Sequence, residues 1–277
     1  MRLVHLLYII ILFHFNLCVL FAEDEKPELS GNFIQGGLVT GKVAPESKVK
    51  INDRMVQVSE DGEFIIGFGR DYPSTALLTI IKIDGSEQQN TLQIAQREYQ
   101  IQRIDGLPKA QVNPDEKTLV RIKQERIAIA KARNLDEARM DFASGFIWPT
   151  KGPITGVFGS QRILNGEPRQ PHYGIDVAAP VGTPVVAPAA GVVTYADNMY
   201  FSGGTLVLDH GHNLSSSFLH LESILVQVGE KVKQGDKIAL VGATGRVTGA
   251  HLDWRMNWHE QRVDPGLLMG ESVNSNK

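Results

Sequence analysis

Between residues 31 and 105 the chain alternates short runs of β-favouring residues with turn signals, and this spacing limits the folds open to it. Typical runs are MVQV at residues 55–58 and LLTIIKI at residues 77–83. Asn52-Asp53 and Asp84-Gly85 supply turns between the runs. Several short strands separated by turns at close intervals favour a small β-sandwich. We therefore expect an accessory β-sandwich domain over residues 28–106.

The pattern changes after Pro114. Residues 115–133 carry Leu119, Ile122 and Ile129 on an incomplete apolar stripe, which predicts a helix inside a linker of residues 107–143. From residue 146 to about 269 the chain returns to strands and turns rich in glycine and valine. The sequence thus predicts a mostly β protein: an N-terminal sandwich, a connecting helix, and a glycine-rich antiparallel β domain over residues 144–270.

The first 22 residues have the layout of a secretory signal. Arg2 is followed by an apolar stretch over residues 6–13, and Ala22 precedes an acidic segment. We expect a signal peptide over residues 1–22 and a protein exported to the periplasm or cell envelope. A retained anchor is the alternative, because residues 3–21 are nearly long enough to span a membrane. Cys18 is the single cysteine, so removal of this segment leaves no thiol for disulfides or catalysis.

The charge balance argues against one class of partner. Lys and Arg number 28 and Asp and Glu 31, which gives a formal net charge of −3. Such a chain lacks the basic field that attracts a polyanion, and we expect no nucleic-acid partner.

Histidine and aspartate recur at strand spacing in the second half of the chain. His172 and Asp176 lie four residues apart and His251 and Asp253 two apart, so each pair can share one face of a strand. His220 lies between them, framed by apolar residues. Catalytic zinc takes three ligands from histidine and carboxylate groups and binds water at a fourth position. His172, Asp176 and Asp253 can form such a set, which leaves His220 and His251 for the water's proton and for the oxyanion.

The order of these motifs resembles the lysostaphin-type zinc metallopeptidase family, whose members are peptidoglycan endopeptidases. That family shares a His-x-x-x-Asp motif, a Tyr-x-His-Leu segment, a Val-x-x-Gly repeat and a terminal His-x-His. The matching segments here are residues 172–176 (HYGID), 218–221 (FLHL), 228–236 (VGEKVKQGD) and 242–253 (GATGRVTGAHLD). The resemblance implies a metallopeptidase domain over residues 144–270. It also implies that His172 and Asp176 bind Zn²⁺ and that His220 and His251 are the two histidines that assist catalysis without binding the metal.

The chain departs from the family pattern at Asp253, which stands where the family has the second histidine of His-x-His. A carboxylate can bind zinc, but it adds negative charge to the site. The resemblance therefore implies a zinc-dependent endopeptidase with His172, Asp176 and Asp253 as ligands, acting on peptide cross-links between peptidoglycan stem peptides. The alternative is a catalytically inactive relative that binds the cell wall or activates another hydrolase, and a regulatory protein partner also remains open.

Overall fold

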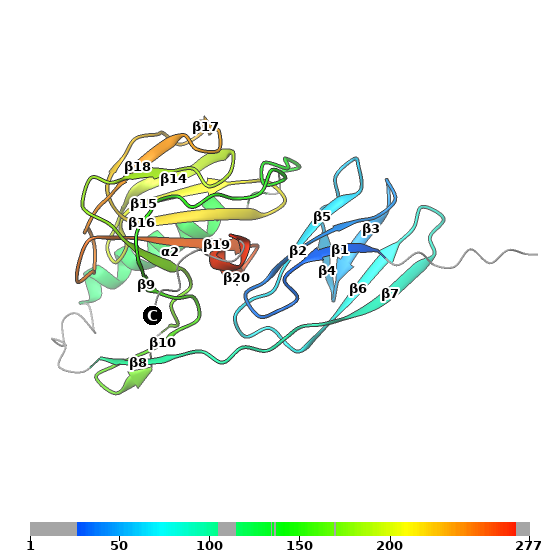
Figure 1. The fold of residues 1–277 in the computed structure, drawn as a ribbon, viewed down its shortest axis with the longest axis horizontal. Coiled ribbons are helices and arrows are strands. Elements are labelled where there is room, and N and C mark those ends of the chain that lie inside the picture. The colour runs from blue at the N-terminus through cyan, green and yellow to red at the C-terminus, as the bar shows by residue number, and fades with distance from the viewer. Residues whose placement is uncertain (1–26, 105–114, 134, 136, 169, 270–277) are drawn as a thin grey trace, which may run out of the picture.

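The computed structural model describes residues 27–104, 115–133, 135, 137–168 and 170–269 (Figure 1). The expected signal peptide over residues 1–22 lies outside this part of the chain. Within the described residues, the protein is built from strands, one α-helix and one short 3-10 helix, which confirms the predicted mostly β fold. No helix among the described residues combines the length and the apolar character needed to span a membrane.

Two small antiparallel sheets form the N-terminal part. One has the strand order β1-β2-β5 and the other the order β4-β3-β6-β7. Inward residues of both sheets, such as Val39, Ile65, Val49 and Leu78, are fully buried in one hydrophobic core. The strands are β1 (Glu28–Gly31), β2 (Leu38–Lys42), β3 (Lys48–Ile51), β4 (Arg54–Val56), β5 (Glu63–Gly67), β6 (Thr75–Ile81) and β7 (Glu87–Gln93).

The segment after β7 leaves the two sheets and joins the second half of the protein. Figure 1 shows this segment running in extended form beneath the molecule to β8 (Ile101–Ile104). β8 pairs in parallel with β10 (Gln161–Leu164), which pairs antiparallel with β11 (Glu167–Pro168). Residues from before and after the helix therefore share one small sheet. The domain boundaries expected from the sequence stay predictions.

The helix α2 (Glu116–Arg133) agrees with the predicted one. The Asp115 carboxylate accepts a hydrogen bond from the backbone N–H of Thr118 at 2.7 Å, which caps the start of the helix. Only Ile122 and Ala132 are buried, as the incomplete apolar stripe implies. The helix lies against β14 and β15 of the large sheet.

A large antiparallel sheet forms the C-terminal part, with the main strand order β17-β14-β15-β16-β19-β12-β9, while β13, β18 and β20 extend it. This arrangement confirms the predicted antiparallel β domain. The elements are β9 (Ile154–Gly156), β12 (Ile175–Ala178), β13 (Pro184–Val186), β14 (Gly191–Met199), β15 (Gly203–Asp209), β16 (Leu214–Ile224), β17 (Lys231–Val232), β18 (Lys237–Val241), β19 (His251–Trp258), β20 (Gln261–Val263) and the 3-10 helix η1 (Pro265–Leu268).

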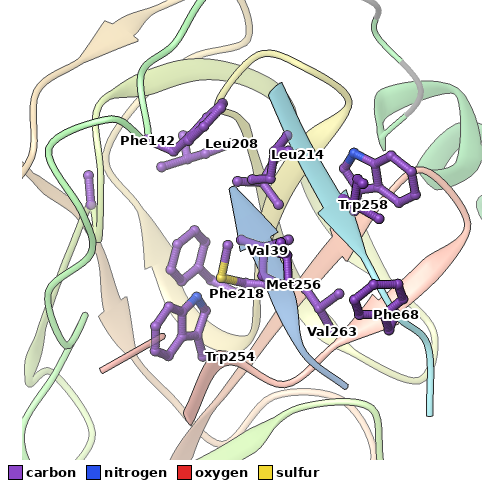
Figure 2. Packing of buried hydrophobic residues seen from close by; sticks show 14 of the residues in the cluster. Val39, Phe68, Phe142, Leu208, Leu214, Phe218, Trp254, Met256, Trp258 and Val263 are labelled. Carbon is purple, nitrogen blue, oxygen red and sulfur yellow. The ribbon is translucent and has the colours of Figure 1, made fainter. Parts of the chain in front are cut away.

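The hydrophobic core is continuous between the two parts. Figure 2 shows Val39 and Phe68 of the N-terminal part packed beside Met256, Trp258 and Val263 of the C-terminal part, and these residues belong to a single cluster. A Cβ atom added to Gly67 would lie 2.7 Å from Cβ of Trp258, so the backbone of β5 approaches β19 too closely for any larger residue. The N-terminal part is thus packed directly on the sheet that carries the histidines and aspartates.

His210 and His212 also lie in the C-terminal part, where both side chains are buried in the core. The ring of His210 packs edge-on against Phe146. Nδ1 of His210 lies 2.6 Å from the carbonyl oxygen of Ala190, and Nε2 lies 2.8 Å from Oγ of Ser216. Burial lowers the pKa of His210 to about 4, so the ring is neutral at physiological pH. These contacts assign His210 to the core.

Candidate metal centre

The pairing of β12 with β19 brings the two aspartates together. The strands are antiparallel, with Asp176 opposite Asp253 and Ala178 opposite His251. Along β19, Leu252 and Trp254 point into the core while residues at the alternate positions face the other side of the sheet. The sequence spacing predicts this alternation. The register between β12 and β19 then places the Asp176 and Asp253 carboxylates opposite each other.

His172 completes a compact group with these carboxylates. One side-chain nitrogen or oxygen of each of His172, Asp176 and Asp253 lies within 4.8 Å of the others, and all three residues are buried. Nε2 of His172 lies 3.0 Å from Oδ1 of Asp176 and 3.5 Å from Oδ2 of Asp253. The structure therefore brings together the three residues that the sequence proposes as ligands.

The protonation of His172 indicates that the site formed by His172, Asp176 and Asp253 fits a cation. Nδ1 lies 3.3 Å from the carbonyl oxygen of Val157, and when it donates its proton there, Nε2 presents a lone pair to the two carboxylates. A lone pair facing carboxylate oxygens is unfavourable unless a cation lies between them. Burial opposes protonation of His172, but hydrogen bonds and charge from Asp176 and Asp253 outweigh it and raise the pKa to about 9. A proton or a metal ion at this position satisfies all three groups, so the residues fit a divalent cation.

Arg255 is the partner that the sequence analysis missed. Its Nη2 lies 2.5 Å from Oδ2 of Asp253, and its Nε lies 2.9 Å from Oδ1 of the same carboxylate. Asp253 and Arg255 are two positions apart on β19, so their side chains lie on the same face of the strand. This spacing could have predicted the ion pair from the sequence. A carboxylate has about four acceptor positions, and Asp253 can accept from Arg255 and still contact a cation beside His172. The guanidinium supplies a positive charge beside the negative charge of the Asp253 carboxylate.

The remaining two histidines lie beside this group. The rings of His220 and His251 have centroids 4.9 Å apart, and Nε2 of His251 lies 3.7 Å from Oδ1 of Asp176. Nδ1 of His220 lies 2.9 Å from the carbonyl oxygen of Thr244, and Nδ1 of His251 lies 2.9 Å from that of Gly249. Each ring is thus oriented by a backbone carbonyl at one nitrogen, which leaves the other nitrogen for chemistry.

The backbone of His220 has an uncommon conformation. Its φ is 65°, in the left-handed region, at an irregularity in the pairing of β15 with β16. A histidine at positive φ is strained by about 1 kcal/mol or more and persists where surrounding contacts fix it. This conformation directs the ring toward His251. No residue pattern in the sequence predicts it.

The loop over residues 157–160 holds His172 in place. The N–H of Gly159 donates to the carbonyl of His172 at 2.7 Å, and the N–H of His172 donates to the carbonyl of Ser160 at 2.9 Å. Together with the Val157 carbonyl at Nδ1, these bonds fix both the backbone and the ring of the ligand candidate.

Residues of the N-terminal part contact this loop and hold it in place. Nε of Arg70 donates to the carbonyl of Gly159 at 2.8 Å, and the Arg70 guanidinium lies over the Tyr99 ring, 4.2 Å from its centroid. Tyr99 packs edge-on against Phe158, and a Cβ atom at Gly159 would lie 2.0 Å from its ring. Residues more than 50 positions before the loop therefore determine where His172 lies.

We expect Arg70→Ala to weaken zinc binding about tenfold, the lower end of what loss of an outer contact to a metal ligand costs. The substitution leaves the Gly159 carbonyl without its Arg70 donor and loosens the loop that fixes His172. Zinc affinity is measured by competition with a fluorescent chelator. Arg54→Ala is the matched control, because Arg54 forms an exposed ion pair with Glu260 at 2.8 Å, also between the two parts. Equal affinities of Arg70→Ala and wild type would contradict this role.

Comparison with known proteins identifies the domain. Residues 170–265 match the family model described as Peptidase family M23. The chain carries an M23 peptidase domain. All five candidate residues, from His172 to Asp253, lie inside the matched range. The resemblance to lysostaphin-type peptidases expected from the motifs is thereby confirmed.

Relatives of this M23 domain include two proteins of Vibrio cholerae serotype O1. The chain is 37% identical over 146 residues to peptidoglycan DD-endopeptidase ShyB, covering 52% of this chain and 32% of that protein. It is 45% identical over 107 residues to peptidoglycan DD-endopeptidase ShyA, covering 39% of this chain and 23% of that protein. The chain thus spans a third or less of the length of these relatives.

Similarity to a solved structure extends over most of the chain. The solved structure is the crystal structure of a Pseudomonas aeruginosa protein assigned to peptidase M23, with a TM-score of 0.68 and 27% sequence identity. The similarity covers 86% of this chain and 95% of that one, so it extends beyond the M23 domain into the N-terminal part.

Proposed function

We propose that this protein is a zinc-dependent endopeptidase that hydrolyses peptide cross-links of bacterial peptidoglycan in the cell envelope. The observation that carries the proposal is the convergence of His172, Asp176 and Asp253 within 4.8 Å, with His220 and His251 beside them. The names of the Vibrio relatives support the choice of substrate. Export to the envelope rests on the signal-like segment over residues 1–22.

In this proposal His172, Asp176 and Asp253 hold the metal. Bound zinc lowers the pKa of a water molecule to about 7 and polarises the scissile carbonyl. Arg255 keeps the charge of the residues around the site equal to that of a His-Asp-His set, because its guanidinium is paired with the Asp253 carboxylate. Asp253 is in this way a ligand with its own counter-ion.

His251 and His220 have different roles in the proposed reaction. His251 is the proposed general base, since its Nδ1 faces a carbonyl and its Nε2 lies near Asp176, with the ring partly open to solvent. His220 is the proposed oxyanion stabiliser, a role in which its Nε2 must carry a proton. Burial lowers the pKa of His220, and the charge of Asp253 and the Thr244 carbonyl offset this only in part. The ring is therefore neutral in the free protein and must take up a proton to fill this role. The reverse division of roles is the alternative.

Removal and return of the metal test this function. Purified protein without residues 1–22 should contain one zinc per chain by elemental analysis. It should also cleave the peptide cross-links of purified sacculi, so that later digestion with a muramidase yields fewer cross-linked and more uncross-linked muropeptides. Stripping the metal with a chelator should stop cross-link cleavage, and added zinc should restore it. A protein that binds wall material but neither holds zinc nor cleaves cross-links would instead be the inactive relative considered above.

A further inference from the structure

Three arginines form a row that begins at the metal centre. Arg255 lies opposite Ser217 in the pairing of β16 with β19, and Arg262 lies opposite Asn257 in the pairing of β19 with β20. Nη1 of Arg262 donates to Oδ1 of Asn257 at 3.0 Å. Nε and Nη2 of Arg133, the last residue of α2, donate to Oγ of Ser217 at 3.1 and 2.9 Å.

The row extends away from the metal along β19. Asp253, Arg255 and Asn257 occupy alternate positions and share one face of the sheet. Two residues of a strand advance about 6.5 Å, so Asn257 and its partner Arg262 lie about 13 Å from Asp253. An extended peptide bound at the metal centre would therefore reach the arginines within a few residues.

Positive charge in this row exceeds negative charge. The Asp253 carboxylate is the partner of Arg255, and within the described residues neither Arg133 nor Arg262 forms an ion pair. Burial and the nearby Arg255 lower the pKa of Arg262 to about 10, and burial with the charges of Arg262 and Arg255 lowers the pKa of Arg133. Three guanidinium groups face two carboxylates, since Asp176 as well as Asp253 acts on Arg255. One positive charge is left over, and an additional anion would offset it.

The row is also accessible. Arg133, Arg255 and Arg262 are each partly exposed, in contrast to the buried Asp253. Arg262 and Tyr173 line a cavity of about 350 Å³ between the turn over residues 69–73 and β20. The Arg262 guanidinium lies 5.5 Å from the centroid of the Tyr173 ring, so an aromatic side chain helps to hold it at the edge of that cavity.

We propose that Arg133, Arg255 and Arg262 form a carboxylate-binding subsite that recognises a free carboxylate of an acidic peptide next to the metal centre. The planar guanidinium matches the two oxygens of a carboxylate, which makes arginine the residue suited to this ligand. The proposal rests on the peptidase function and adds to it a rule for substrate choice: peptides with free carboxylates are preferred over the same peptides in amidated form.

The test compares two forms of one ligand that has no cross-link to cut: a disaccharide-tetrapeptide muropeptide monomer, and the same compound after conversion of its carboxyl groups to carboxamides. Dissociation constants are measured by calorimetry with the zinc-loaded protein. Wild type should bind the acidic form about tenfold more tightly. Arg133→Gln and Arg262→Gln should each reduce that ratio to about twofold or less while zinc content stays at wild-type level.

Arg126→Gln is the matched control, because Arg126 is exposed on the same helix as Arg133 and its substitution removes the same charge. This variant should keep the wild-type ratio. Arg262→Lys should keep part of it, and zinc content reports whether each variant is folded. Equal binding of the two forms by wild type, or equal loss in Arg126→Gln, would overturn the subsite. Failure to cleave the peptide cross-links of sacculi despite a preserved ratio would instead refute the peptidase function alone.

Discussion

Asp253→Ala is expected to abolish zinc binding and to lower the free energy of unfolding by roughly 3 kcal/mol, at the low end for a broken buried ion pair. The metal loses one of three ligands, and Arg255 is left without the carboxylate that it contacts at 2.5 and 2.9 Å. About a quarter of the Arg255 side chain reaches solvent, at 25% exposure, which places the effect at this lower limit. Elemental analysis and urea unfolding measure the two effects separately.

Two further variants separate ligation from charge pairing. Asp253→Ala combined with Arg255→Met should recover most of the stability and none of the zinc, because no charge is then left unpaired. Asp253→His should bind zinc but remain less stable than wild type, since a neutral histidine leaves the Arg255 charge unpaired. Full zinc content in Asp253→Ala would show that Asp253 is not a ligand.

His251→Ala is expected to lower the turnover of sacculi by about 100- to 10,000-fold, the usual contribution of a positioned acid or base. The zinc content should not change, because the metal is assigned to His172 and the two aspartates, and Nε2 of His251 lies 3.7 Å from Asp176. The measurement is the initial rate at which cross-linked muropeptides disappear from sacculi, counted after digestion with a muramidase, together with metal analysis of the same sample.

His259→Asn is the control for the loss of a histidine. His259 follows β19, its φ of 48° is one that asparagine tolerates, and its ring packs against Trp258 away from the metal centre. This variant should retain wild-type turnover. Retained turnover in His251→Ala would exclude His251 as the base and would transfer that role to His220.

Local sequence patterns predicted much of the site. The alternation of His251, Leu252, Asp253 and Trp254 places two polar groups on one face of β19, and the spacing of His172 and Asp176 does the same before and within β12. This alternation follows from strand geometry alone, so it can be recognised in a single sequence. The helix over residues 115–133 was predictable from its incomplete apolar stripe after Pro114, whereas its cap at Asp115 came from the structure.

Features that depend on distant pairing were not predictable. The contact between Arg133 and Ser217 joins residues 84 positions apart, and the left-handed backbone of His220 arises from an irregularity in strand pairing. The support of Gly159 by Arg70 likewise depends on how the N-terminal part packs. None of these has a local residue pattern, because tertiary contacts determine each of them.

The core that Val39 and Phe68 share with Trp258 and Val263 has a consequence for folding (Figure 2). These contacts join residues of the first third of the chain to residues of the last third. The pairing of β8 with β10 likewise joins strands that precede and follow α2. Folding that depends on so many nonlocal contacts is slow, since loop-closure entropy is lost before those contacts form. A fragment limited to the M23 domain would expose the apolar faces of Trp258 and Val263, so we expect the domain to be less soluble and less stable without the N-terminal part.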